Sequence, residues 1–212
     1  MLPRSLPKEI NVFIKSGLKE WSAVVDALGT GTQTLIVRTY LPGDKTFLLY
    51  PTFSFYANNA SKPENFEKFI QPKHVEAARR SGRETTDLAR IEYLVKISYF
   101  ATVTDTLELT KPSQIDALEN FSIWTKEHLH AYAASAKSKK CYVWLLRVYE
   151  LPEPFTVGRI AQGGPPNYYV PPRAIQVDEP LPVLKDDDYN KTAQSLQSLL
   201  TTTKPASSKS IH

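Results

Sequence analysis

Two arginines within apolar runs are the first residues whose chemistry needs an explanation. Arg38 lies in "QTLIVRTY" and Arg147 lies in "YVWLLRVYEL". A buried guanidinium without a partner is costly, so one interpretation is a structural ion pair, with Glu20 or Glu150 as the carboxylate. The other interpretation is a guanidinium presented to a phosphate or to a planar base. The sequence leaves both interpretations open.

Two adjacent tyrosines in a loop are the second candidate for recognition chemistry. Tyr168 and Tyr169 lie in the Pro- and Gly-rich run "PEPFTVGRIAQGGPPNYYVPP", with Arg159 before them and Arg173 after them. Aromatic rings beside arginines can stack on unpaired bases. The same rings can instead fix the loop to the domain, and the sequence supports the two interpretations equally.

Several kinds of catalytic motif do not occur in the chain. There is no glycine-rich phosphate loop, no H-E-x-x-H and no G-x-S-x-G. His128 and His130 are two residues apart, which places them on different faces of a helix. The acids at 186–188 form a run of like charge, which is typical of a solvated surface. We therefore predict no catalytic residue, no metal site and no cofactor, and expect a protein that is not an enzyme.

The composition is that of a folded domain with a mild positive charge. The chain has 212 residues, 42% of them hydrophobic, and a formal net charge of +4. This charge permits RNA or DNA as a partner without requiring it. The single cysteine, Cys141, lies in an apolar run, which indicates a buried thiol and a reducing compartment. No apolar run is long enough to span a membrane, so a soluble cytoplasmic protein is expected.

The first elements that must position these residues are a helix and two strands. Apolar residues at helical spacing predict a helix over residues 16–28 that ends at glycines 29 and 31. The β-branched run 33–40 and the run "TFLLYP" predict two strands, which we expect to pair as a hairpin around "LPGDK".

The remaining pattern predicts one α+β domain over residues 1–184. A polar, charged segment at about 58–90 indicates a helical insertion, and alternation over 91–103 predicts a long strand that is bent midway. Two helices follow, the second capped by Thr125, and "CYVWLLRVYEL" is apolar on both faces, as in a central strand. We expect a small, curved mixed sheet or barrel with flanking helices, and a flexible tail over 185–212 that contains a weak helix before its Ser-, Thr- and Lys-rich end.

Four segments resemble a family catalogued as domain of unknown function 1802. They are "LKEWSAVVDAL", "FLLYPTF", "FSIWTKEHL" and "YVWLLRVYELPEP", and together they span residues 17 to about 155. The family name implies no activity, so this resemblance contributes only membership.

A second resemblance is to the ASCH domains of the PUA-like barrel superfamily. Gly31 and Arg38 match a frame in which a helix ends at a glycine and a strand carries an arginine. Gln33 and Ile36 stand where that family has lysine and glutamate, so the resemblance does not carry over hydrolase activity. It implies a PUA-like barrel, a fold that mostly binds RNA or modified bases in a cleft beside the first helix and strand.

The sequence therefore favours a non-catalytic module that binds RNA or modified-base DNA. The residues expected to line its cleft are Lys19, Gln33, Arg38, Arg159, Tyr168 and Tyr169. One alternative is a hydrolase or nuclease that uses Glu20, Asp26 or His128. Another is a protein-interaction module that uses the 58–90 insertion.

Overall fold

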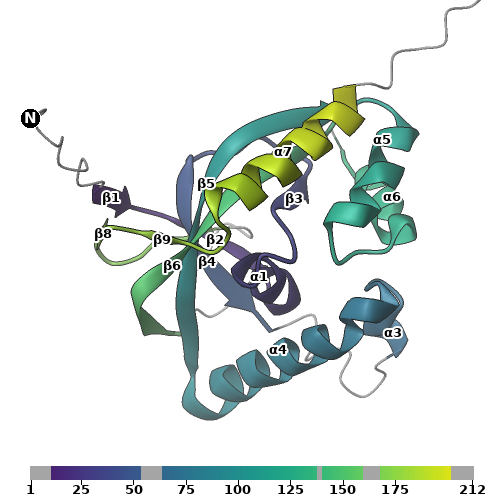
Figure 1. The fold of residues 1–212 in the computed structure, drawn as a ribbon. Coiled ribbons are helices and arrows are strands. Elements are labelled where there is room, and N and C mark those ends of the chain that lie inside the picture. The colour runs from purple at the N-terminus through teal and green to yellow at the C-terminus, as the bar shows by residue number, and fades with distance from the viewer. Residues whose placement is uncertain (1–10, 54–63, 138–139, 160–167, 202–212) are drawn as a thin grey trace, which may run out of the picture.

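The computed structural model describes residues 11–53, 64–137, 140–159 and 168–201, and its core is a strongly curved mixed sheet (Figure 1). The strands of this sheet are β2 (Gly17–Trp21), β3 (Leu35–Arg38), β4 (Thr46–Thr52), β5 (Leu94–Leu109), β6 (Cys141–Gly158), β7 (Tyr168–Tyr169) and β9 (Leu181–Pro182). Their order is β3-β6-β5-β4-β2-β7, with β9 on β6. β2 and β4 are parallel, whereas the other pairs are antiparallel. The expected curved mixed sheet is confirmed.

Helices surround this sheet. They are α1 (Ser22–Gly29), α3 (Glu64–Glu67), α4 (Val75–Asp87), α5 (Pro112–Ala117), α6 (Lys126–Ala134) and α7 (Asp186–Thr201), with short helical turns at Pro72–His74, Leu88–Glu92 and Leu118–Phe121. A separate antiparallel pair joins β1 (Asn11–Ile14) to β8 (Ile175–Asp178). No helix in the ranges described above has the length and apolar character needed to cross a membrane.

The long β5–β6 pair explains the curvature. Its register shifts between Ile97 and Tyr99 and again between Val103 and Asp105, and such bulges bend and twist a strand pair. This confirms the predicted bend. Strand β6 also has two buried faces, because Trp144 packs into the core beside α1 while Val143 packs into the core beside α6 and α7.

The predicted hairpin of the runs 33–40 and "TFLLYP", which correspond to β3 and β4, is wrong. Leu35–Arg38 pairs with β6, and Thr46–Thr52 pairs with β5 and β2. The doubly buried strand β6 offers a longer apolar surface than a local partner could, so long-range pairing prevails over proximity in the chain.

The predicted helix over 16–28 is half wrong, because Gly17–Trp21 forms β2 and the helix begins only at Ser22. Leu18 and Leu28 are both fully buried, so the helical spacing identified core residues correctly. Parallel pairing of β2 with β4 satisfies the backbone of the first half in a way that sequence spacing alone does not reveal.

Within the segment 58–90, helical residues occur at Glu64–Glu67, Pro72–His74 and Val75–Asp87, while residues 58–63 lie outside the described ranges. Helix α4 lies beside α1 (Figure 1) and buries the small residues Ala78, Ser81 and Gly82. Small side chains allow the two helix backbones to approach closely.

The predicted flexible tail needs correction over residues 186–201, which form helix α7. Tyr189, Leu196 and Leu200 of this helix are buried, and their spacing of seven and four places them on one face. The Arg147 guanidinium donates to Asp186 at 2.5 Å and lies 4.8 Å from the Tyr189 ring. The polar composition of this segment hides a narrow apolar stripe. Residues 202–212 lie outside the described ranges.

Candidate functional site: the cavity beside Arg38

A cavity of about 460 Å³ opens between β2, the end of β3 and helix α6. This volume is in the range of about 300–1,000 Å³ that is typical of small-ligand sites. Its lining residues come from distant parts of the chain: Lys19, Glu20, Trp21, Val24, Ile36, Val37, Arg38, Thr39, Tyr40, Thr52, Trp124, His128, Leu129 and Tyr132.

An ion pair between Arg38 and Glu20 forms part of the cavity wall. Arg38 Nη2 donates to Glu20 Oε2, and Arg38 Nη1 donates to the Val37 carbonyl at 2.8 Å. Glu20 Oε1 accepts the Trp21 backbone N–H at 2.8 Å. In the strand order β3 is at one end and β2 is next to the other end, so this ion pair joins two strands that are not neighbours in the sheet. Of the two partners left open by the sequence, Glu20 is the one present.

Burial and this ion pair set the charge states of the wall. Burial alone lowers the pKa of the Arg38 guanidinium, but the Glu20 carboxylate more than offsets this, and the pKa is raised overall. Burial raises the pKa of Tyr40 to about 12, against the opposing effect of Arg38. Burial also lowers the pKa of His128, so its imidazole is neutral at neutral pH. The wall therefore holds one charge-compensated pair among neutral rings.

Three rings, those of Trp21, Trp124 and His128, form an aromatic wall of the cavity. The Trp21 and Trp124 rings meet edge to face with centroids 4.9 Å apart. The His128 ring lies 4.7 Å from Trp124 and 5.9 Å from Trp21. Such packing fixes the orientation of the rings before any ligand arrives.

The Tyr40 hydroxyl is buried beside the Arg38 guanidinium, and no hydrogen bond of normal geometry joins it to the residues that the structure describes. The Tyr40 ring packs edge to face on Trp144, with centroids 5.5 Å apart. A buried polar atom without a partner costs about 1–3 kcal/mol. A polar atom of a ligand in the cavity would remove this penalty.

Two glutamines hold the α6 side of the cavity in place. Gln71 Nε2 donates to the carbonyls of Glu119, Ser122 and Trp124 at 2.6, 2.7 and 3.0 Å. Gln33 is 2% exposed, and its Oε1 accepts the Ile123 N–H at 2.9 Å while its Nε2 donates to the Leu35 carbonyl at 2.6 Å. Gln33 is thus engaged in joining two segments, behind the cavity and away from its lining.

The structure brings together only part of the predicted site. Lys19 and Arg38 line the same cavity. Tyr168 is partly buried on β7, where it pairs with Leu18 and packs on the core beside α1.

The other loop residues lie apart from this cavity. Tyr169 is buried, with its ring 5.2 Å from that of Tyr50. Arg159 follows β6, between the Phe53 and Tyr93 rings at 5.5 and 5.6 Å. Neither Tyr169 nor Arg159 is among the residues that line the cavity.

Sequence reasoning named His128 only as a candidate catalytic residue and missed that Trp124, His128 and Tyr132 share one cavity. The three rings recur at steps of four in "FSIWTKEHLHAY", with Trp124 just before the Thr125 cap and the other two on α6. A stripe of rings at this spacing usually belongs to the core, but all three are only partly buried here and line the cavity. The spacing of four residues between these rings was the sequence signal that could have identified this part of the cavity.

Comparisons with known proteins identify a family and a distant structural likeness. A family model described as domain of unknown function (DUF1802) matches residues 17–195. No curated protein matches the chain. A variant of the ASCH protein from Zymomonas mobilis is similar in structure, with a TM-score of 0.41 and 12% identity over 85% of this chain and 94% of the other. The ASCH structure from the same organism has a TM-score of 0.40 and 12% sequence identity, over 84% of this chain and 93% of the other.

Proposed function

The chain belongs to the domain of unknown function 1802 family, and we propose that it is a nucleic-acid-binding module whose Arg38 cavity holds an unpaired base. A base of single-stranded RNA or DNA would enter between the aromatic wall and the Arg38–Glu20 pair. The phosphate next to it would lie at Lys19, which is partly exposed at the cavity.

The observation that carries this proposal is that the cavity has a packed aromatic wall and also contains polar groups that can still form hydrogen bonds. Trp21 and Trp124 present ring edges and faces that are already oriented, and stacking one base on an aromatic side chain is worth about 1–3 kcal/mol. The Tyr40 hydroxyl and the remaining donors of Arg38 can pair with the polar edge of a base.

The charge balance of the cavity favours an anionic ligand. Arg38 is compensated by Glu20, so Lys19 is left as the uncompensated charge among the lining residues at neutral pH. A lysine at a rim is suited to a phosphate, which it attracts as a point charge. The sequence pI of about 9.0 means that the whole chain is also positively charged at neutral pH.

The state of Glu20 favours binding over catalysis. Its carboxylate accepts from both Arg38 and the Trp21 backbone, and it is buried, whereas a general base needs an oxygen free to take a proton. Asp26, the other acid considered for catalysis, does not line this cavity.

The direct experiment is a fluorescence anisotropy titration of labelled single-stranded RNA and DNA oligonucleotides at several salt concentrations. We expect affinity to fall with salt, and Lys19→Gln to lower the slope by about 0.7, the value for one phosphate contact on a single strand. The matched control is Lys191→Gln, at an exposed lysine on α7. Absence of binding at low salt, or equal losses in the two variants, would refute the proposal.

A further inference from the structure

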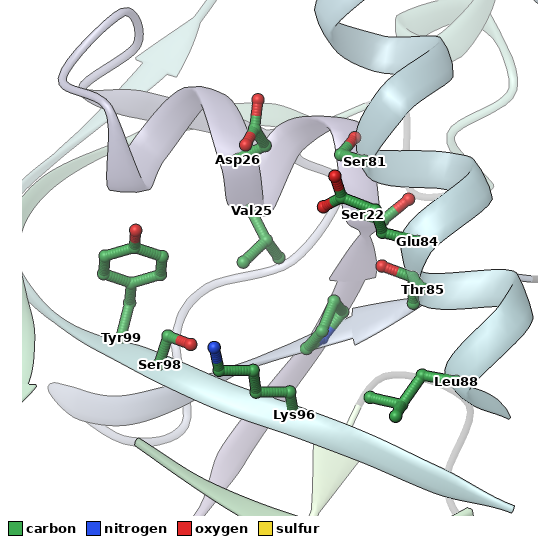
Figure 2. Close-up of a pocket in the computed structure, with 11 residues that line it drawn as sticks. Ser22, Val25, Asp26, Ser81, Glu84, Thr85, Leu88, Lys96, Ser98 and Tyr99 are labelled. Atoms are coloured by element: carbon green, nitrogen blue, oxygen red, sulfur yellow. The ribbon is translucent and has the colours of Figure 1, made fainter. Parts of the chain in front are cut away.

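A second, smaller cavity of about 210 Å³ lies between α1, α4 and β5 (Figure 2). It shares no lining residue with the Arg38 cavity. Its buried floor comes from residues on three elements: Ser22, Val25, Pro51 and Ser81. A cavity of this size suits a small molecule better than a polymer, because drug-sized ligands occupy about 300 Å³ or more.

The charged groups of this small cavity are arranged on two sides. Asp26 and Glu84 come from the helices α1 and α4, whereas Lys96 comes from strand β5 (Figure 2). Within the described ranges, no salt bridge joins Lys96 to either acid. Opposite charges thus line one cavity without being paired.

Two hydroxyl groups that line this cavity are also available for hydrogen bonding. The side chains of Ser98 and Tyr99 make no hydrogen bond with the residues that the structure describes. The Tyr99 ring is held against Gly29, where an added Cβ would lie 2.4 Å from ring carbons. The absence of a side chain at Gly29 therefore allows the Tyr99 ring to occupy its position in the wall of this second cavity.

The Asp26 carboxyl is partly buried and lies near one cation, Arg80, and one acid, Glu84. Burial raises its pKa, Arg80 lowers it and Glu84 raises it again, with a net upward shift. A cation beside both acids would compensate the burial and the mutual repulsion.

We propose that this cavity binds a small zwitterion of the α-amino acid class. The ammonium group would lie between Asp26 and Glu84, and the carboxylate would lie at Lys96 with the Ser98 hydroxyl as a further donor. A zwitterion satisfies both sides of the cavity, whereas a simple amine or a simple carboxylate satisfies one side and leaves the other without a partner. This binding is independent of the proposed nucleic-acid function.

The test is calorimetric titration of the full chain with glycine, alanine, ethylamine and acetate as probes. We expect the two amino acids to bind at least about tenfold more tightly than ethylamine or acetate, since a tenfold ratio needs only about 1.4 kcal/mol. Glu84→Gln and Lys96→Gln should each reduce amino-acid affinity about tenfold, as loss of one charge-assisted hydrogen bond predicts. Both residues are exposed, so these variants should fold.

Matched controls are Glu153→Gln and Lys191→Gln, which remove exposed charges outside this cavity and should leave affinity unchanged. Glu84→Gln should also leave oligonucleotide binding unchanged, which separates this proposal from the previous one. Absence of binding by both amino acids would overturn the proposal. So would equal binding of ethylamine, or equal losses in the variants and the controls.

Discussion

At the scale of single residues, Arg38 shows how one ion pair links the fold to the cavity. Arg38 and Glu20 are largely buried and join two strands that are not neighbours in the sheet. We expect Arg38→Ala to lower the free energy of unfolding by about 3–5 kcal/mol, because it leaves the Glu20 carboxylate buried without its partner. Urea denaturation measures this change. The double variant Arg38→Leu with Glu20→Leu should recover much of the loss, and an unchanged midpoint for Arg38→Ala would contradict this role.

Tyr40 allows stability and binding to be separated. Its buried hydroxyl makes no hydrogen bond of normal geometry with the described residues, so Tyr40→Phe should keep the free energy of unfolding unchanged or raise it by up to about 1 kcal/mol. The same change should weaken oligonucleotide binding, since the hydroxyl is a proposed contact for the base. Thermal denaturation and anisotropy titration of one preparation test both effects. A destabilised variant that binds normally would argue against this assignment.

His128 gives the protein a defined pH dependence. Burial lowers its pKa below the ordinary 6.5, so the unfolded chain binds more protons than the folded chain as pH falls below about 6.5. The free energy of unfolding should therefore fall on acidification in this window. His128→Phe keeps a ring beside Trp21 and Trp124 and should make the pH dependence shallower. Urea denaturation between pH 5 and 7.5 measures the slopes, and identical slopes would refute the prediction.

Part of the candidate site could be predicted from the sequence. An arginine within an apolar strand led to Arg38, and the resemblance to folds with a cleft beside the first helix and strand led to Lys19; both residues line the cavity. Gln33 could not be judged in this way, because its amide is engaged by Ile123 and Leu35, which depends on a contact across 90 positions of sequence.

At the scale of elements, helix α6 is the part of the site that depends most on distant contacts. Residues around Ile70 and Gln71 pair with the segment that leads into α6, through a β-bridge from Ile70 to Trp124 and the three bonds of Gln71. Periodicity and the Thr125 cap predicted that this helix exists. Its position over the cavity follows from pairing between segments about fifty residues apart, which periodicity does not encode.

Helix α7 is the element whose removal gives the clearest outcome. Truncation before Asp186 removes the buried side chains of Leu196 and Leu200, each worth about 1.5–3 kcal/mol, so we expect at least about 3 kcal/mol of lost stability. Loss of Asp186 also leaves the buried Arg147 without its carboxylate. Chemical denaturation of the truncated chain measures the effect, with a truncation after Thr201 as control. Equal stability of the two chains would restore the interpretation as a flexible tail.

At the scale of the whole molecule, the curved sheet determines where ligands can bind. Bulges in β5–β6 bend the sheet until β2 and β3 approach, and the Arg38 cavity opens where they meet. Alternation predicted the long bent strand β5, the doubly apolar run predicted β6 as a central strand, and the order of the elements favoured a curved mixed sheet. The pairing of β3 with β6 and the start of α1 at Ser22 could not be predicted, because local propensity is overridden there by long-range pairing.

The most direct test of nucleic-acid binding at the Arg38 cavity uses the three tryptophan indole N–H signals in a ¹H–¹⁵N spectrum. Trp21 and Trp124 line the cavity, whereas Trp144 is fully buried and donates its N–H to the Tyr40 carbonyl at 3.1 Å. On titration with a single-stranded oligonucleotide, the Trp21 and Trp124 signals should shift more than that of Trp144. An oligonucleotide that binds while the Trp21 and Trp124 signals stay in place would contradict the proposed site.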